Sequence, residues 1–223
     1  MDQVLTAIQK KVATVLEVRD LTESTYVLRF ERVGLDFKPG QYIVVGLPGS
    51  REKREYSIYS SAIVPYLEVL IKEVDTGDVS KKLKRVKPGD KVEVEGPFGY
   101  FVLEGHKLAT NDFLFIASGT GISPFHSFVK SYPQLNYTLL HGVRNISEGY
   151  EKLEYEKNHH ILCTSRDERG DFQGRVTDYI KTHPVDPLTL CYLCGNSEMV
   201  DDAYKILEKQ GVPPAHLHAE IYF

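Results

Sequence analysis

Three residues close together in the chain, Arg54, Tyr56 and Ser57, combine a cation, a flat aromatic ring and a small hydroxyl. On an extended segment the side chains alternate between faces, so Arg54 and Tyr56 lie on one side while Ser57 points elsewhere. A guanidinium suits a pyrophosphate, a phenol ring suits a flat heterocycle, and a hydroxyl can hydrogen-bond a ring nitrogen. The pattern predicts a segment that holds a flavin. A surface cation beside a core tyrosine is the alternative.

A second phosphate anchor is predicted at Gly77, Asp78, Val79 and Ser80. Gly77 allows the backbone to approach a ligand closely. The amides of Asp78 and Val79 and the Ser80 hydroxyl can donate to a phosphate at a helix start. A capped helix after a hairpin is the alternative for these four residues.

The glycine-rich turn at 119–121 stands between a strand-like apolar run and a predicted helix. Parallel sheets bind phosphate or a nicotinamide ribose at such turns. The turn is not a G-x-G-x-x-G, because Pro124 occupies the sixth position and closes the helix start. A simple connection between strand and helix is the alternative.

Several arginines follow strands of the second half of the chain. Ser165 and Arg166 come just after the third strand, Arg175 follows nine residues later, and Arg144 comes after the second strand. A 2′-phosphate needs two or more donors, and arginine gives them a fixed bidentate geometry. These residues therefore favour NADP(H) over NAD(H). Solvated loop arginines are the alternative, and the acidic residues at 167, 168 and 171 would repel a phosphate.

Cys191 and Cys194 have the spacing of a redox or metal pair. Residues three apart on a strand point to opposite faces, so we expect Cys191 in the core and Cys194 at the strand end. His216 and His218 share a strand face but have no clear third ligand. We therefore expect no metal site.

The first half of the chain has the pattern of a small antiparallel barrel. Strands separated by turn residues are predicted at 12–18, 25–29, 42–47, 55–59, 66–73 and 91–95. Closely spaced strands of this kind are typical of β-barrels.

After about residue 107 the pattern changes to strands that alternate with helices. The strands are predicted at 113–118, 137–142, 161–165 and 189–194. Helices are expected from Pro124 with Ser123 as N-cap, around Tyr150, around Val176, and up to Gln210. This alternation predicts an α/β domain with a doubly wound parallel sheet and helices on both faces.

The order of the motifs along the chain resembles that of the ferredoxin-NADP reductase family. These motifs lie at 54–58, 77–80, 96–99, 119–124 and 192–196, followed by the ending Glu220-Ile221-Tyr222-Phe223. The resemblance is closest to the bacterial branch of this family and covers nearly the whole chain. It implies an FAD-binding β-barrel at 1–106 and an NADP(H)-binding α/β domain at 107–223.

The resemblance also implies roles for single residues. Ser57, Cys194, Glu220 and Tyr222 would form the reacting centre, with Tyr222 covering the flavin ring. The other FAD contacts would be Arg54, Glu55, Tyr56, Leu70, Ile71, Lys72, Gly77, Asp78, Val79, Ser80, Thr120 and Phe223. The NADP contacts would be Gly121, Arg144, Ser165, Arg166, Arg175, Cys194, Gly195 and Asn196.

The activity implied is electron transfer through FAD between NADP(H) and a one-electron carrier, ferredoxin or flavodoxin. A basic patch is a candidate docking site for an acidic carrier; its members are Arg51, Lys53, Lys81, Lys82, Lys84 and Arg85. One alternative is a reductase of free flavin, a haem protein or an oxygenase component. An oxygenase reductase usually carries a cysteine-rich iron–sulfur domain, and these 223 residues contain three cysteines. Another alternative is a non-catalytic nucleotide-binding module.

Composition excludes several other classes of protein. A net charge of −4 makes general binding of nucleic acid improbable. No apolar run approaches the roughly 20 residues of a bilayer span, and the N-terminus lacks a basic region followed by an apolar stretch. Three cysteines, an odd number, argue against a disulfide framework. We therefore expect a cytoplasmic protein.

Overall fold

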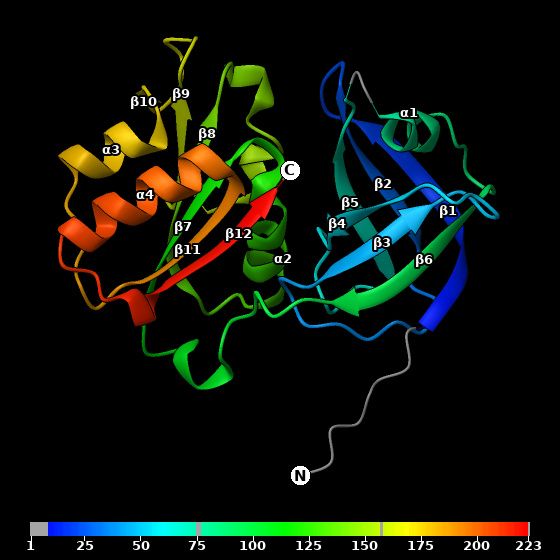
Figure 1. Cartoon of the computed structure of the whole chain (residues 1–223), viewed down its shortest axis with the longest axis horizontal. Helices are drawn as coiled ribbons and strands as arrows, with labels where there is room; N and C mark the ends of the chain where they lie inside the picture. Colours follow the sequence, from blue (N-terminus) through cyan, green and yellow to red (C-terminus); the bar gives the residue numbers. More distant parts are fainter. Residues whose placement is uncertain (1–8, 75–76, 157, 223) are drawn as a thin grey trace.

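A computed structural model describes residues 9–74, 77–156 and 158–222 and folds them into two six-stranded sheets (Figure 1). The prediction for Phe223 lies outside the described residues. The first sheet is antiparallel and the second is parallel. The predicted combination of an antiparallel barrel and an α/β domain is confirmed.

The first sheet forms a barrel that is nearly closed. Its strands run in the order β4-β3-β6-β1-β2-β5. A single bridge between Ile58 and Val69 joins the end of β4 to β5, the two outermost strands of this order. The strands are β1 (Gln9–Asp20), β2 (Thr25–Glu31), β3 (Tyr42–Gly46), β4 (Lys53–Ser57), β5 (Tyr66–Lys72) and β6 (Lys91–Phe98).

Alternating apolar residues fill the inside of this barrel. Ile43, Val45, Val92 and Val94 are fully buried, because every second side chain of a strand points to the same face. The short helix α1 (Asp78–Lys84) follows β5, and it packs Leu83 against the same core. The barrel therefore carries β4 and the 77–80 segment on a rigid support.

The second sheet has the strand order β10-β9-β8-β7-β11-β12, and all its strands are parallel. The chain runs from β7 outward to β10, then returns to the other side of β7 for β11 and β12. A switch of this kind opens a crevice at the carboxyl ends of the strands. The strands are β7 (Asp112–Ser118), β8 (Asn136–Val143), β9 (His160–Thr164), β10 (Phe172–Gln173), β11 (Leu190–Asn196) and β12 (Leu217–Tyr222).

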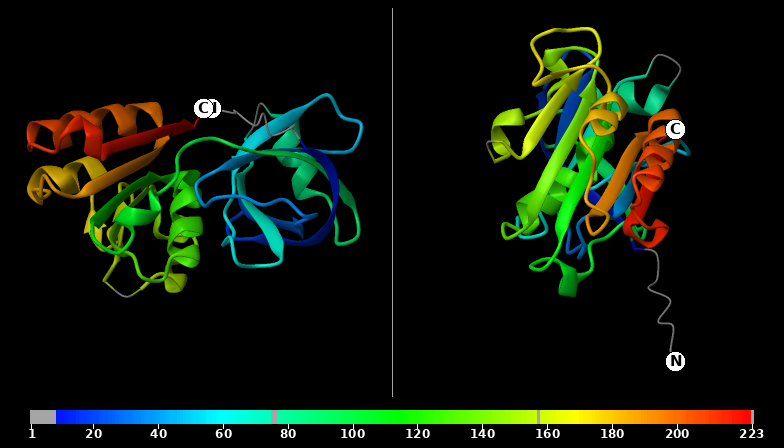
Figure 2. Two further views of the ribbon diagram at one scale, coloured as in Figure 1. Left: turned by 90° about the horizontal axis from the view of Figure 1, so that it is seen from below. Right: turned by 90° about the vertical axis from the view of Figure 1, so that its left-hand side faces the viewer.

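Helices cover both faces of the parallel sheet, as predicted (Figure 2). α2 (Ser123–Ser131) packs against the face that carries Phe115 and Tyr192. α3 (Val176–Thr182) and α4 (Ser197–Lys209) pack against the other face, where Cys163 and Cys191 lie. Short 3-10 turns η1 (Gly105–Lys107), η2 (Gly119–Ile122), η3 (Ile146–Glu148), η4 (Lys152–Glu154) and η5 (Pro214–His216) complete the described structure.

Two predictions about helices are wrong, and His216 lies in the turn η5 rather than on the predicted strand face with His218. The stretch around Tyr150 is not an α-helix: it contains η3 and η4, and Glu151 between them has a left-handed backbone with φ of 49°. Ser123 is the first residue of α2 rather than its N-cap, because η2 continues directly into the helix and Ile122 occupies the capping position. The Ser123 hydroxyl instead donates to the Thr120 carbonyl at 2.8 Å.

Helix α2 lies between the parallel sheet and the barrel (Figure 1). One apolar cluster joins Phe125 and Phe128 of this helix to Val27, Tyr59 and Leu70 of the barrel. The two sheets therefore share a continuous core, and their relative position is set by what packs around α2.

Candidate functional site

A cleft of about 1240 Å³ opens between β4, β5 and the C-terminal strand β12. Most of the predicted flavin contacts and part of the predicted reacting centre line it. They are Arg54, Glu55, Tyr56, Ser57, Leu70, Lys72, Gly77, Val79, Ser80, Thr120, Glu220 and Tyr222. The structure thus gathers residues that lie up to 168 positions apart in the sequence, from Arg54 to Tyr222, around one space.

Other predicted contacts lie outside the lining of this cleft. Ile71 points into the barrel core with 0% exposure, so only its backbone could reach a ligand. Asp78 is exposed at the start of α1. The lining also leaves out the buried residues Gly121, Cys194 and Gly195 and the exposed Asn196. Arg144, Ser165, Arg166 and Arg175 are exposed outside the strands and helices.

Strand β4 presents Arg54 and Tyr56 to the cleft from the barrel. Arg54 is exposed, and one guanidinium nitrogen donates to the Lys53 carbonyl at 2.8 Å, which leaves further donors for an anion. Tyr56 is half-buried against the barrel core, and burial raises its pKa to about 12. The phenol therefore stays neutral at physiological pH and offers a flat ring.

Ser57 joins the barrel to the last strand of the parallel sheet. Its side chain is buried, and its hydroxyl donates to Oε1 of Glu220 at 3.2 Å. The pKa of Glu220 is raised to about 6, mainly because the carboxyl is buried; the bond from Ser57 opposes this rise and the charge of Glu55 adds to it. Glu220 can therefore hold or release a proton close to neutral pH.

Cys194 and Tyr222 lie beside this pair on neighbouring strands. Cys194 is fully buried, and burial raises the pKa of its thiol well above the usual value, so it remains protonated. Burial also raises the pKa of Tyr222. The Tyr222 hydroxyl is buried, and its interactions with the Ser57 hydroxyl and the Cys194 thiol contribute to the shift of its pKa.

The glycine-rich turn packs tightly against the end of β11. A methyl group at Gly121 would overlap the carbonyl oxygen of Cys194 and would lie 2.8 Å from Cα of Gly195. Gly195 in turn has φ of 143° and lies against Ser118. These glycines allow the ends of β7 and β11 to meet, which brings Thr120 to the cleft.

His141, which the sequence analysis did not single out, holds the other side of this turn. Its Nε2 lies 2.9 Å from the Gly119 carbonyl, so Nε2 carries the proton and donates. Burial lowers the pKa of His141 to about 4, and the ring is neutral at physiological pH. A histidine inside the apolar run 137–142 was the only signal that could have marked it.

A second cleft of about 670 Å³ lies at the loops after β8 and β9. Ser165 and Arg166 line it, as does Arg169, which the sequence analysis missed. Arg169 pairs with the carboxylate of Asp167 at 2.7 Å, and this bond is the main cause of the lowered pKa of Asp167. Arg144 and Arg175 are exposed nearby in the chain but do not line this cleft.

The main cleft also contains aromatic residues that were not predicted. Tyr42, Tyr100 and Phe101 line it, and the Tyr100 ring is 99% exposed. The Gly96-Pro97-Phe98-Gly99 motif immediately precedes Tyr100 and could have drawn attention to it.

The predicted basic patch is partly neutralised. Lys53 lies 2.7 Å from Glu93 and 2.6 Å from Glu95, and only 15% of its side chain is exposed. Lys82 pairs with Glu52 at 3.1 Å, and Lys84 donates to the carbonyl of Glu23. Lys53 therefore does not supply a free charge, whereas Arg51 and Arg85 are exposed.

The cleft has the donors that a flavin dinucleotide needs. Its volume exceeds the roughly 300–1,000 Å³ of ordinary small-molecule pockets, which suits a long ligand. Arg54 offers a cation for a pyrophosphate, Tyr56 and Tyr222 offer flat rings, and Ser57 offers a hydroxyl. The residues present therefore fit FAD.

Comparison with known proteins divides the chain into two matched regions. Residues 12–103 match the model of the oxidoreductase FAD-binding domain family. Residues 115–205 match the model of the oxidoreductase NAD-binding domain family.

No helix within the described ranges has the length and apolarity needed to cross a bilayer.

Two curated relatives match almost the whole chain. The toluate 1,2-dioxygenase electron transfer component of Pseudomonas putida is 30% identical over 93% of this chain and 66% of its own length. Ferredoxin–NADP reductase B of Sorangium cellulosum is 28% identical over 94% of this chain and 96% of its own length. The chain spans 57 to 66% of the first oxygenase electron-transfer and reductase components that it matches.

A solved structure gives the same fold. The ferredoxin NADP+ reductase of Neisseria gonorrhoeae, with bound FAD and NADP, aligns with a TM-score of 0.85 at 20% identity. The alignment covers 96% of this chain and 99% of that one.

The backbone of Cys194 lies so close to Gly121 that a larger residue at 121 should destabilise the fold. We expect Gly121→Ala to lower the free energy of unfolding by about 1 to 3 kcal/mol, because the methyl group overlaps the Cys194 backbone. Chemical denaturation of the purified variant measures this loss. Gly105→Ala is the matched control, since a methyl group there meets nothing within 4 Å. Equal stability of the two variants would contradict the packing argument.

Because the pKa of Glu220 is raised in the folded state, we expect the free energy of unfolding to depend on pH. Below the unfolded pKa of 4.5 the carboxyl is protonated in both states, and as pH rises through about 6 its ionisation destabilises the folded state. Glu220→Gln removes this loss, so the variant should gain stability over wild type between pH 4 and 8, by at most about 2 kcal/mol. Denaturation curves across this range measure the difference. A difference that does not change with pH would show that Glu220 titrates normally.

Proposed function

Since this chain belongs to the ferredoxin reductase family of oxidoreductases, we propose that it binds FAD and transfers electrons between NADP(H) and a one-electron carrier. Bound FAD supplies a group that accepts a hydride and passes on single electrons. The residues of the chain bind and orient both dinucleotides and exclude water from the space between them. Ferredoxin or flavodoxin is the proposed carrier.

The observation that carries this proposal is the meeting of Ser57, Glu220 and Tyr222 at one cleft. Ser57 belongs to the barrel, whereas Glu220 and Tyr222 belong to the parallel sheet. We propose that Arg54 and Lys72 hold the pyrophosphate, and that Tyr56 and Tyr222 contact the flavin ring.

The remaining residues of the centre would shape the space for the nicotinamide. Glu220 supplies a carboxyl group with a pKa of about 6, and Cys194 supplies a buried neutral thiol. Thr120 lines the same cleft at the end of β7, where a parallel sheet accommodates a dinucleotide. Gly121, Gly195 and Asn196 would bring the backbone close to the coenzyme.

We propose NADP(H) as the coenzyme because of the second cleft. Ser165 and Arg166 are exposed there and can donate to a 2′-phosphate, and Arg175 and Arg144 follow on neighbouring loops. Asp167 would repel a phosphate if its charge were free. Its carboxylate pairs with Arg169 and accepts a hydrogen bond from the Ile146 amide at 3.1 Å, which reduces that repulsion.

A second candidate function is supply of electrons to an oxygenase component. The curated relative that is 30% identical is named as an electron transfer component of a dioxygenase. Both functions use the same two dinucleotides and differ in the protein that receives the electrons. Arg51 and Arg85 are exposed members of the basic patch and could contact an acidic carrier.

The first experiment tests FAD and nicotinamide together. We expect purified protein incubated with FAD to show the flavin bands, and anaerobic NADPH to bleach them faster than NADH does. Ferredoxin, flavodoxin and an oxygenase Rieske component are then compared as acceptors, with ferricyanide as an acceptor that needs no docking. A protein that stays colourless with FAD would favour a nucleotide-binding module without turnover.

The coenzyme preference has its own test. We expect Arg166→Ala combined with Arg175→Ala to raise the KM for NADPH more than about 100-fold, because each of the two charge-assisted bonds to the phosphate contributes about 1.5–3 kcal/mol. The KM for NADH should change less than about twofold. Lys181→Ala is the control, since Lys181 is exposed on α3 and pairs with Asp178. Equal losses with both coenzymes would count against the 2′-phosphate role.

A further inference from the structure

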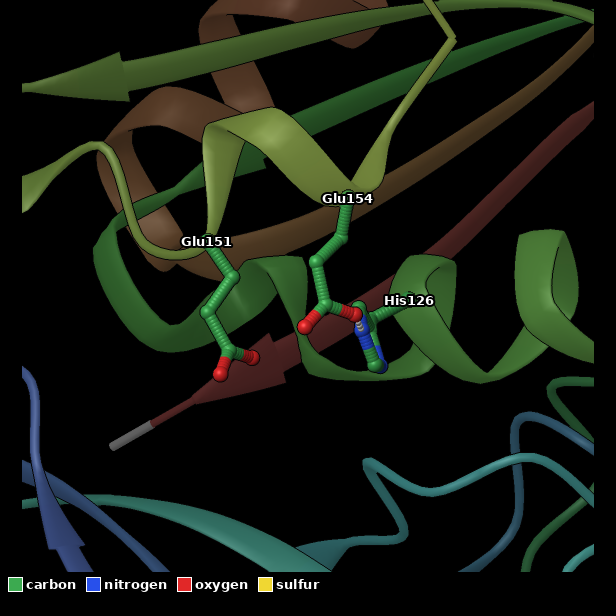
Figure 3. Close-up of side chains that lie close together, drawn as sticks. All are labelled: His126, Glu151 and Glu154. Atoms are coloured by element: carbon green, nitrogen blue, oxygen red, sulfur yellow. Dashed lines mark hydrogen bonds and ion pairs between the residues drawn. The ribbon is translucent and has the colours of Figure 1, made fainter.

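Three titratable side chains converge where α2 meets the segment after β8. His126, Glu151 and Glu154 point toward one another in Figure 3, and their potential ligand atoms all lie within 4.8 Å of one another. His126 lies on α2, Glu154 lies in η4, and Glu151 directly precedes that turn. None of them was singled out by the sequence motifs.

A divalent metal ion is the first explanation for such a group, but the local charges argue against it. Arg19 pairs with Glu151 at 2.6 Å, and Lys130 pairs with Glu154 at 2.9 Å. Both carboxylates are therefore balanced by cations of the chain. A metal ion would add two positive charges next to Arg19 and Lys130, which electrostatic repulsion opposes.

The contacts of His126 point to another role. The ring is 4% exposed and lies parallel to the ring of Tyr59, with centroids 3.8 Å apart and an angle of 8° between the planes. Its Nδ1 lies 2.7 Å from the Tyr59 carbonyl oxygen. Because a carbonyl oxygen only accepts, Nδ1 carries a proton and donates it to this bond. Nε2 lies 3.3 Å from Glu154.

The two residues joined by this bond are close in sequence to both halves of the site. Tyr59 comes two residues after Ser57, on the continuation of β4. His126 comes five residues after Gly121, in the helix that follows the glycine-rich turn. The bond from His126 to Tyr59 therefore connects the proposed flavin segment to the glycine-rich turn, because only a few residues separate each of its ends from these sites.

Glu151 holds the other end of Tyr59. The Tyr59 hydroxyl donates to Glu151 at 2.6 Å, and Arg19 of β1 pairs with the same carboxylate. Next to His126, the Ser127 hydroxyl donates to the Ser60 carbonyl at 2.7 Å. Tyr59 is thus fixed at its backbone, its ring and its hydroxyl.

We propose that His126 is a positioning residue that sets the distance between the glycine-rich turn and the flavin segment. The inference rests on the proposed function, because that distance decides how the nicotinamide lies against the flavin. Reacting atoms must approach to about 3–3.5 Å, and a misplacement of about 1 Å can reduce the rate about 100-fold. Loss of the Nδ1 donor should therefore disturb the alignment of the nicotinamide against the flavin more than it weakens coenzyme binding.

Two variants separate the hydrogen bond from the bulk of the ring. His126→Leu keeps an apolar side chain and removes both nitrogens, whereas the amide of His126→Asn can still donate near the position of Nδ1. We expect His126→Leu to slow anaerobic flavin reduction by NADPH about 10- to 100-fold with KM changed less than about threefold. His126→Asn should retain most of the wild-type rate.

A second readout uses the protein without coenzyme and does not depend on activity. The Ala62 amide donates to Ser131 Oγ at 2.8 Å, so its hydrogen exchange reports on contact between α2 and the segment after β4. We expect amides of this contact to exchange about tenfold faster in His126→Leu than in wild type. His126→Asn should exchange at nearly the wild-type rate.

The possible results distinguish the two proposals. If neither coenzyme reduces the wild-type flavin, the proposed function fails, while hydrogen exchange still tests the contact. If wild type is reduced and His126→Leu matches it in rate and exchange, the positioning role is wrong. Equal damage in both variants would assign the effect to ring packing and overturn the hydrogen-bond argument. A melting temperature that Zn²⁺ raises in wild type but not in Glu154→Gln would overturn the charge argument and assign a metal site.

Discussion

The site depends on the contact between α2 and the segment that follows β4. Apolar packing of Phe125 and Phe128 against the barrel holds the two sheets together, and buried hydrogen bonds to the Tyr59 and Ser60 carbonyls fix their register. Buried polar groups need partners, so sliding of one sheet past the other would leave these carbonyls unsatisfied. The cleft is therefore a property of both sheets together, since its walls come from each.

The protonation states of the side chains at the cleft depend on which of them are buried. Burial keeps Cys194 as a thiol and Tyr222 as a phenol, and it brings Glu220 close to half-ionised near pH 6. Only Glu220 of these three can then exchange a proton at physiological pH. Arg54 and Lys72, by contrast, stay exposed at the edge of the cleft, where a charged ligand can reach them.

Local sequence patterns predicted most of the fold, because alternation and βαβ periodicity act over a few residues. The helix expected around Tyr150 failed because Tyr150 and Glu151 turn toward Thr25 and Arg19 of the barrel, and such contacts cannot be read from a local pattern. Lys53 was misjudged for the same reason, since Glu93 and Glu95 lie on another strand. His126 and His141 act through backbone carbonyls, which leave no motif. The individual ligand contacts remain predictions.

The strand that carries Glu220 and Tyr222 lies at an edge of its sheet. β12 pairs with β11 on one side only, because it is the last strand in the order. An edge strand can separate without breaking the remaining ladders, so its opening requires less free energy than global unfolding. Under mild denaturant the proposed reacting centre would therefore come apart before the barrel and the central strands unfold, so the flavin site would be lost ahead of most of the secondary structure.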